Sequence, residues 1–136
     1  MSDFSAVTVA TTRPDLNLLG HWGFEEDGGS TVSDLSGKAN AGAVYNAAWI
    51  EGISGSALDF NGVNAQVVVN NSAALNPTTA LTIAAWIAPN SWSGYPRILQ
   101  KGSNSDQYRL LARNLSLRFS LAGINLDMPA PAPGSW

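Results

Sequence analysis

The chain has 136 residues, of which 45% are apolar and only 12% are charged, and its formal net charge is −3. This length suits one domain, and the mild acidity argues against a nucleic-acid partner, because phosphate binding needs a basic patch. No apolar run approaches the ~18 residues of a membrane span. The chain has no cysteine and only one histidine, His21, which excludes thiol catalysis, disulfides, and zinc sites built on Cys or on several His side chains.

The N-terminus is interpreted as an extension over residues 1–16, followed by one domain over residues 17–136. The first twelve residues contain Asp3 but no basic residue and no long apolar stretch, so they do not have the form of a secretory signal. We expect an extracellular or virion-associated protein whose export does not depend on a signal in this sequence.

The rest of the chain has the pattern of short strands separated by turns. No window of eleven or more residues keeps a helical period without an interrupting Gly, Pro or Asn. An unbroken apolar–polar alternation over Leu115–Leu121 is typical of a strand with one wet face, and Arg113-Asn114 before it predicts a hairpin. We therefore predict an all-β fold, an antiparallel β-sandwich or jelly roll. The predicted strands, in chain order, are Leu18–Phe24, Ala57–Phe60, Gln66–Val69, Leu81–Ala88, Arg97–Lys101, Tyr108–Arg113 and Leu115–Ala122.

Several of these segments also carry recognisable motifs, which occur at Leu19–Glu26 with Asp34–Gly42, Ala57–Gly62, Leu81–Pro89, Ile98–Gly102 with Tyr108–Leu110, and Pro133–Trp136. In this order they resemble the laminin-G-like domains of bacterial and phage type in the concanavalin A-like lectin/glucanase superfamily. The resemblance implies a jelly-roll sandwich. It also implies that C-terminal strands are missing after Trp136, so we expect completion by further chain or by neighbouring subunits in an assembly.

Catalysis is not expected. Glucanases of the superfamily carry carboxylates at alternate positions of one strand, so that two of them flank the glycosidic bond. The only acidic run here is Glu25-Glu26-Asp27, and adjacent strand residues face opposite sides. His21 lies in an apolar segment, and no Gly-x-Ser-x-Gly element accompanies it.

A calcium ion is the candidate cofactor. Calcium takes six to eight oxygen ligands from carboxylates, amides and backbone carbonyls, and Glu25, Glu26, Asp34 and Asn40 supply such oxygens within sixteen residues. The resemblance supports this interpretation, because the family often binds calcium in this part of the domain. The alternative is a solvated acidic turn in which Asp34 caps its own loop through an Asx-turn. The loop Asn61–Gln66 lacks the acidic residues usual in the family, so it is not expected to contribute a site.

Carbohydrate is the candidate ligand. Sugar recognition needs a flat aromatic face together with a few polar side chains. Trp92, Tyr95 and Arg97 lie on one predicted loop, with Asn104 and Asp106 on a nearby polar loop. The alternative for Trp92 is that it folds back as a lid over the core, where Trp22, Trp49 and Trp86 are also expected.

Two functions follow from these patterns. The first is a non-catalytic, lectin-like module that binds a glycan or polysaccharide, with calcium as a candidate stabiliser. The second is a structural or decoration module of a larger assembly, such as a phage virion or a surface fibre.

Overall fold

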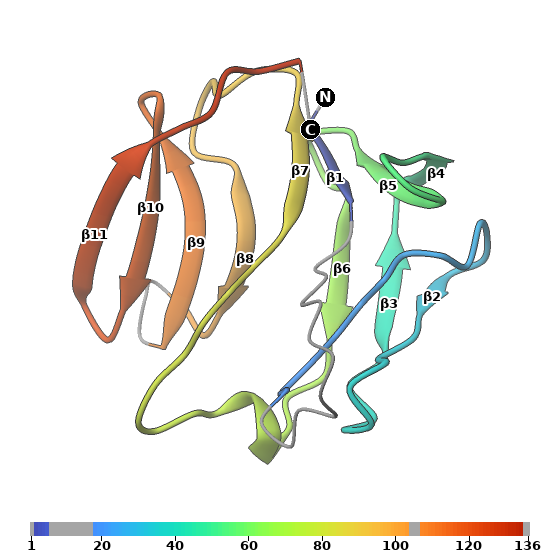
Figure 1. Cartoon of the computed structure of the whole chain (residues 1–136), viewed down its shortest axis with the longest axis horizontal. Coiled ribbons are helices and arrows are strands. Elements are labelled where there is room, and N and C mark those ends of the chain that lie inside the picture. The colour runs from blue at the N-terminus through green and yellow to red at the C-terminus, as the bar shows by residue number, and fades with distance from the viewer. Residues whose placement is uncertain (1, 6–17, 104–106, 135–136) are drawn as a thin grey trace. The chain divides into compact units, whose positions relative to one another are not determined.

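A computed structural model describes residues 2–5, 18–103 and 107–134 (Figure 1). The described residues form antiparallel strands and one short 3-10 helix, η1 (Ala73–Leu75), which confirms the predicted all-β class. The chain divides into two compact units, residues 1–88 and residues 89–135. The strands are β1 (Ser2–Ser5), β2 (Thr31–Val32), β3 (Gly42–Tyr45), β4 (Ala48–Glu51), β5 (Ser56–Phe60), β6 (Gln66–Val69), β7 (Trp86–Pro89), β8 (Arg97–Lys101), β9 (Tyr108–Arg113), β10 (Ser116–Leu121) and β11 (Ile124–Pro129).

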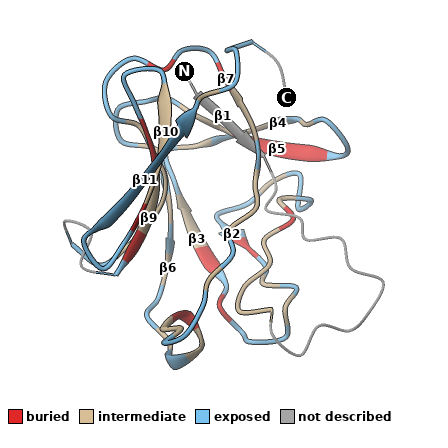
Figure 2. Cartoon of the chain, turned by 60° about the vertical axis from the view of Figure 1, so that its left-hand side comes forward, coloured by how far each residue is buried: buried red, intermediate tan, exposed pale blue. Residues whose placement is uncertain are grey.

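The first unit contains two sheets, with the strand orders β4-β5-β1-β7 and β2-β3-β6. Its core includes Ala57 and Leu58 on β5 and Val32 on β2, all fully buried, and Figure 2 marks the buried part of β5 in red. Gly42 is required in the second sheet, because a Cβ there would lie 2.6 Å from the Val67 side chain and 2.8 Å from that of Val32. Close packing of two strands therefore fixes this glycine.

The predicted strand over Leu18–Phe24 is wrong. The backbone N–H of His21 donates to the Asp34 carboxylate at 2.9 Å, and its carbonyl accepts from Leu35, so these groups bond to a loop instead of a strand ladder. Phe24 has a φ of 57°, which is incompatible with extended strand geometry. The segment is held by the loop that begins at Asp34.

The predicted strand over Leu81–Ala88 is confirmed only at its end, where β7 covers Trp86–Pro89. Trp86 was expected in the core but is 48% exposed, so that expectation is wrong. Trp22 and Trp49 are half-buried, and their indole N–H groups donate to the carbonyls of Asn40 and Gly29. Neither ring is among the fully buried core residues, but the N–H group of each indole has a backbone acceptor.

The second unit contains one four-stranded sheet in the order β11-β10-β9-β8, visible as neighbouring arrows in Figure 1. The predicted β9–β10 hairpin is confirmed, and its two-residue turn is Asn114-Leu115, one position later than expected. Both residues have positive φ, 49° and 64°, as a type I′ turn requires. Ala122-Gly123 forms a second such turn, with φ of 47° and 85°, between β10 and β11.

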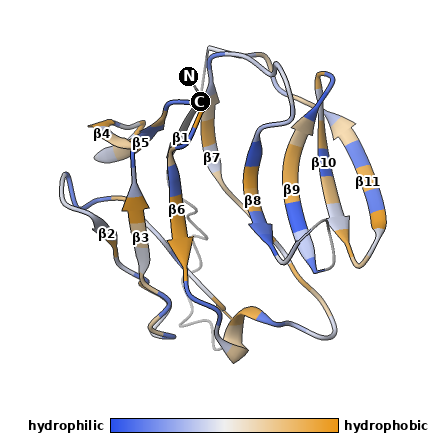
Figure 3. Cartoon of the chain, turned by 180° about the vertical axis from the view of Figure 1, so that it is seen from behind, coloured by the Kyte–Doolittle hydropathy of each residue, from blue (hydrophilic) through white to orange (hydrophobic). Residues whose placement is uncertain are grey.

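The sheet of the second unit has one apolar and one polar face. Residues directly opposite in antiparallel strands project to the same side, so Leu110, Phe119 and Leu126 share the apolar face. Figure 3 shows the resulting hydrophobic and hydrophilic bands along β9 and β11. The polar face is not fully exposed to solvent, because Ser120 on it is completely buried. The apolar face is not fully buried either, because Leu126 on it is 61% exposed.

Candidate functional site

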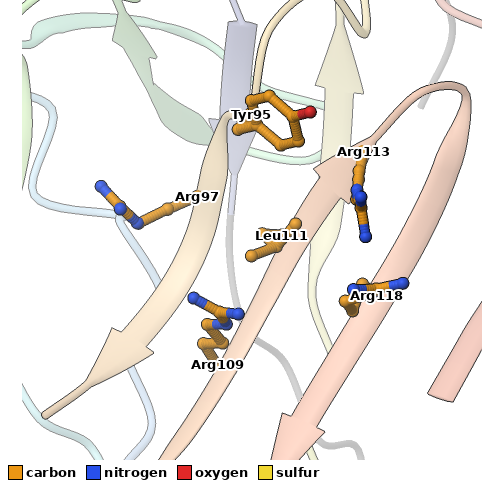
Figure 4. A pocket seen from close by; sticks show the side chains of 6 residues that line it. All are labelled: Tyr95, Arg97, Arg109, Leu111, Arg113 and Arg118. Atoms are coloured by element: carbon orange, nitrogen blue, oxygen red, sulfur yellow. The ribbon is translucent and has the colours of Figure 1, made fainter. Parts of the chain in front are cut away.

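Four arginine side chains surround Leu111 on the polar face of the β8–β11 sheet, and we call this group the arginine face (Figure 4). The register places Arg97 of β8 and Arg118 of β10 directly opposite Leu111, one on each side. Arg109 and Arg113 lie two residues before and after Leu111 on β9, where the pleat returns side chains to the same face. The pleat and the register alone therefore bring four cationic groups around one leucine.

These side chains line a surface hollow of about 260 Å³, with Tyr95 at its border. Leu111 is only 5% exposed and forms an apolar part of the lining, whereas Tyr95 is 62% exposed. The guanidinium carbon of Arg113 lies 6.0 Å from the centroid of the Tyr95 ring, at the outer limit of a cation–π contact. The hollow thus combines an open aromatic ring, a leucine and several planar cations.

One of the four arginines is already paired. Arg118 donates from Nε and Nη2 to the two carboxylate oxygens of Asp127, each at 2.6 Å, in a bidentate ion pair across the β10–β11 register. The hydrogen bond from Arg118 lowers the pKa of the Asp127 carboxyl, and the same bond raises the pKa of the Arg118 guanidinium. This pair shows the geometry with which this face holds a carboxylate.

A second arginine is oriented by a chain of hydrogen bonds. Arg109 donates from Nε to the hydroxyl of Ser120 at 3.3 Å, and Ser120 donates to Oδ1 of Asn125 at 2.7 Å. Ser120 is fully buried, so this link has a fixed position in the sheet. Nε of Arg109 therefore bonds to Ser120, and the side chain of Arg109 lines the hollow.

The charge of the chain is divided unequally between its two units. Residues 89–135 contain five basic and two acidic side chains, whereas residues 1–88 contain two basic and eight acidic side chains. Within the described residues, Arg97, Arg109 and Arg113 take part in no ion pair. The arginine face is therefore a cationic patch on a chain whose net charge is negative.

The structure brings together only some of the predicted carbohydrate-binding residues. Tyr95 and Arg97 both line the hollow. Trp92 is 4% exposed, and its indole N–H donates to the Pro131 carbonyl at 2.7 Å. Because the ring is buried, a sugar cannot stack on it. Trp92 therefore matches the alternative interpretation, a lid over the core. Asn104 and Asp106 lie outside the described residues.

Sequence reasoning missed three residues of the site, Arg109, Arg113 and Arg118. A signal was present, because Arg109, Leu111 and Arg113 occupy alternate positions of a predicted strand and so share one face. The cross-strand neighbour Arg118 could be assigned only once the hairpin turn was fixed at Asn114-Leu115. The excess of basic residues after residue 88 was a second signal, hidden by the negative total.

The residues predicted to bind calcium do not form a cage in this structure. No three His, Asp or Glu side chains converge as metal ligands anywhere in the described ranges. Glu25 accepts from the backbone N–H of Ser56 at 3.2 Å, and Glu26 accepts from that of Ser33 at 2.7 Å. The two carboxylates thus serve different backbone segments.

Asp34 and Asn40 are similarly committed. Oδ1 of Asp34 accepts from His21 and Ser36, and Oδ2 accepts from Asn40, each at 2.9 Å. Burial raises the pKa of the Asp34 carboxyl, but hydrogen bonds from the Ser36 side chain and these backbone groups together outweigh it, so the pKa is lowered. The Asn40 amide nitrogen donates to the Leu19 carbonyl and its Oδ1 accepts from Ser72, so in this structure the oxygens of both residues bind groups of the protein itself.

Comparison with protein-family models, with curated proteins and with solved structures finds no match. The laminin-G-like assignment therefore rests on the sequence motifs. No helix in the described part of the chain has the length and apolar character needed to cross a membrane.

Proposed function

We propose that this protein is a non-catalytic carbohydrate-binding module that uses the hollow of the arginine face as its binding site. The observation that carries the proposal is the exposed ring of Tyr95 beside planar guanidinium donors and Leu111. An aromatic face contacts the C–H groups of a sugar, and guanidinium N–H groups donate to its oxygens. Strands hold five of the six lining residues, which limits the entropy lost on binding.

The proposal includes a laminin-G-like sandwich of jelly-roll type. The order of the sequence motifs and the antiparallel pairing of every described sheet support it. The residues that line the hollow belong to the second unit, whereas the predicted calcium ligands belong to the first.

A glycan array tests the function directly. We expect the wild-type chain to bind a defined subset of glycans and Tyr95→Ala to weaken that binding about tenfold. Tyr45→Ala is the matched control, because Tyr45 is a similarly exposed tyrosine, at 50%, in the other unit. Absence of binding to every glycan, or equal losses in both variants, would contradict the proposal.

A structural role in a larger assembly is the second candidate function. The apolar face of the β8–β11 sheet favours it. Ile124, Leu126 and Met128 on the edge strand β11 are 76%, 61% and 41% exposed. Light scattering after size-exclusion chromatography tests this function. We expect the wild-type chain to self-associate and Leu126→Ser to reduce association, and a wild-type monomer that unfolds cooperatively would exclude it.

A further inference from the structure

The arginine face is electrostatically incomplete. Four cationic side chains in neighbouring positions repel one another, and Asp127 is the only described carboxylate that is paired with any of them. Strand pairing would be more stable with fewer like charges, so their arrangement points to a ligand of opposite charge. We propose that the arginine face binds an acidic polysaccharide whose sugars carry carboxylates, an inference that rests on the proposed carbohydrate-binding function.

The carboxylate is indicated by a contact within the protein. Arg118 holds Asp127 through two parallel N–H···O bonds, the geometry that suits a planar carboxylate. Arg97 and Arg113 present the same guanidinium group and form no ion pair within the described residues, although the charge of Arg113 helps to lower the pKa of Asp127. The carboxylate of a uronic acid in the ligand would accept hydrogen bonds from Arg97 and Arg113, as the Asp127 carboxylate does from Arg118.

A chain of charged sugars is indicated by the spread of the cations. Arg109 and Arg113 are four residues apart on β9, which corresponds to about 13 Å along an extended strand. A repeating acidic chain that follows β9 can contact the two arginines in succession. Leu111 between them and Tyr95 at the border offer apolar surface to the sugar rings.

A single-stranded nucleic acid is the competing polyanion. Proteins that bind single strands without sequence preference place several aromatic rings along a cationic groove. Among the residues that the structure describes, Tyr95 is the only aromatic side chain that lines this hollow. The observations therefore favour the polysaccharide, and nucleic-acid binding becomes an outcome of the test.

The test compares two polymers with the same sugar backbone, in which the carboxyl groups are either charged or methyl-esterified. Polygalacturonate carries a carboxylate on each sugar, and its methyl ester has the same backbone without the charge. We expect isothermal titration calorimetry to give at least tenfold tighter binding to polygalacturonate, with an affinity that falls as salt is added. Oligothymidylate serves as the nucleic-acid probe, and we expect it to bind more weakly than polygalacturonate.

Variants of the face give opposite expected changes. Arg113→Ala and Arg97→Ala should each weaken polygalacturonate binding about five- to tenfold. Asp127→Asn should strengthen it about threefold, because it releases the guanidinium of Arg118. An increase in affinity cannot result from misfolding, so Asp127→Asn tests the inference even if the alanine variants fail to fold. Lys38→Ala, an exposed lysine in the first unit, is the control and should leave the affinity unchanged.

The outcomes separate the inference from the proposed function. Equal binding of both galacturonan polymers, with loss in Tyr95→Ala, would overturn the acidic ligand and leave the carbohydrate-binding function standing. Binding of neither polymer together with silence on a glycan array would overturn both. Tighter binding of oligothymidylate than of polygalacturonate, or unchanged affinity in Asp127→Asn, would overturn the inference.

Discussion

Asp34 holds three chain segments together, and its removal should destabilise the first unit. The two substitutions to compare are Asp34→Ala and Asp34→Asn. The carboxylate accepts backbone N–H groups from His21, Ser36 and Asn40, each at 2.9 Å, and these residues span the loop that replaces the expected first strand. Alanine removes these three contacts and the hydrogen bond from the Ser36 side chain, whereas asparagine keeps one oxygen and places an amide where the other stood.

The magnitude follows from these bonds. Each half-exposed hydrogen bond contributes about 1 kcal/mol, so Asp34→Ala should lower the free energy of unfolding by about 3 kcal/mol. Asp34→Asn should retain the two bonds to Oδ1 and cost roughly half as much, about 1–2 kcal/mol. The larger loss corresponds to a decrease in Tm of roughly 15 °C for a unit of this size. Asp27→Asn is the control, because Asp27 is exposed and Asn tolerates its positive φ of 53°.

The assay is thermal unfolding followed by tryptophan fluorescence, together with amide hydrogen exchange of His21, Ser36 and Asn40. Because the pKa of Asp34 is lowered in the folded state, its contribution is complete above the ordinary carboxyl value of 3.8 and is lost as the pH falls through the lower folded pKa. The difference between the wild type and Asp34→Ala should therefore be constant near neutral pH and shrink below about pH 3.8. An Asp34→Ala variant no less stable than Asp27→Asn would refute this reasoning.

Three further predictions concern packing, turn conformation and metal binding. Trp92→Phe removes the N–H group that donates to Pro131 and should lower the free energy of unfolding by about 1–2 kcal/mol in urea, and an unchanged midpoint would contradict the lid assignment. Leu115→Gly should raise Tm by a few degrees, because Leu115 is 72% exposed and has a φ of 64°, and a lower Tm would show that Leu115 makes a contact of its own. Chelation by EDTA should leave Tm unchanged, and an increase of several degrees in millimolar calcium would instead support the calcium hypothesis.

The strands with clear turn signals could be predicted from the sequence. The bounds of β6, β8 and β9 agree with the expected runs, because each is a short apolar or alternating segment between Gly and Asn turns. The strands β1, β2, β3, β4 and β11 were missed. For β11 a signal existed, since Ile124–Met128 alternates apolar and polar residues after the turn at Ala122-Gly123.

The candidate site was harder to predict because it depends on the register between strands. Tyr95 and Arg97 belong to one local segment and were found from the sequence, whereas Arg118 reaches the same hollow only through its pairing with Leu111. Trp92 illustrates the opposite error. An aromatic side chain on a loop can bind a sugar or cover a core, and only the contact with Pro131, 39 residues away, decides between them.

The laminin-G-like fold, the carbohydrate ligand and the non-catalytic role remain proposals, and the location of the ligand is their most direct test. We would record NMR spectra of the isotope-labelled full chain during titration with oligogalacturonate. The account predicts shift changes concentrated at Tyr95, Arg97, Arg109, Leu111 and Arg113, with Arg118 following in the Asp127→Asn variant. Shift changes confined to residues 1–88, or none at any concentration, would contradict the assignment of the arginine face as the binding site.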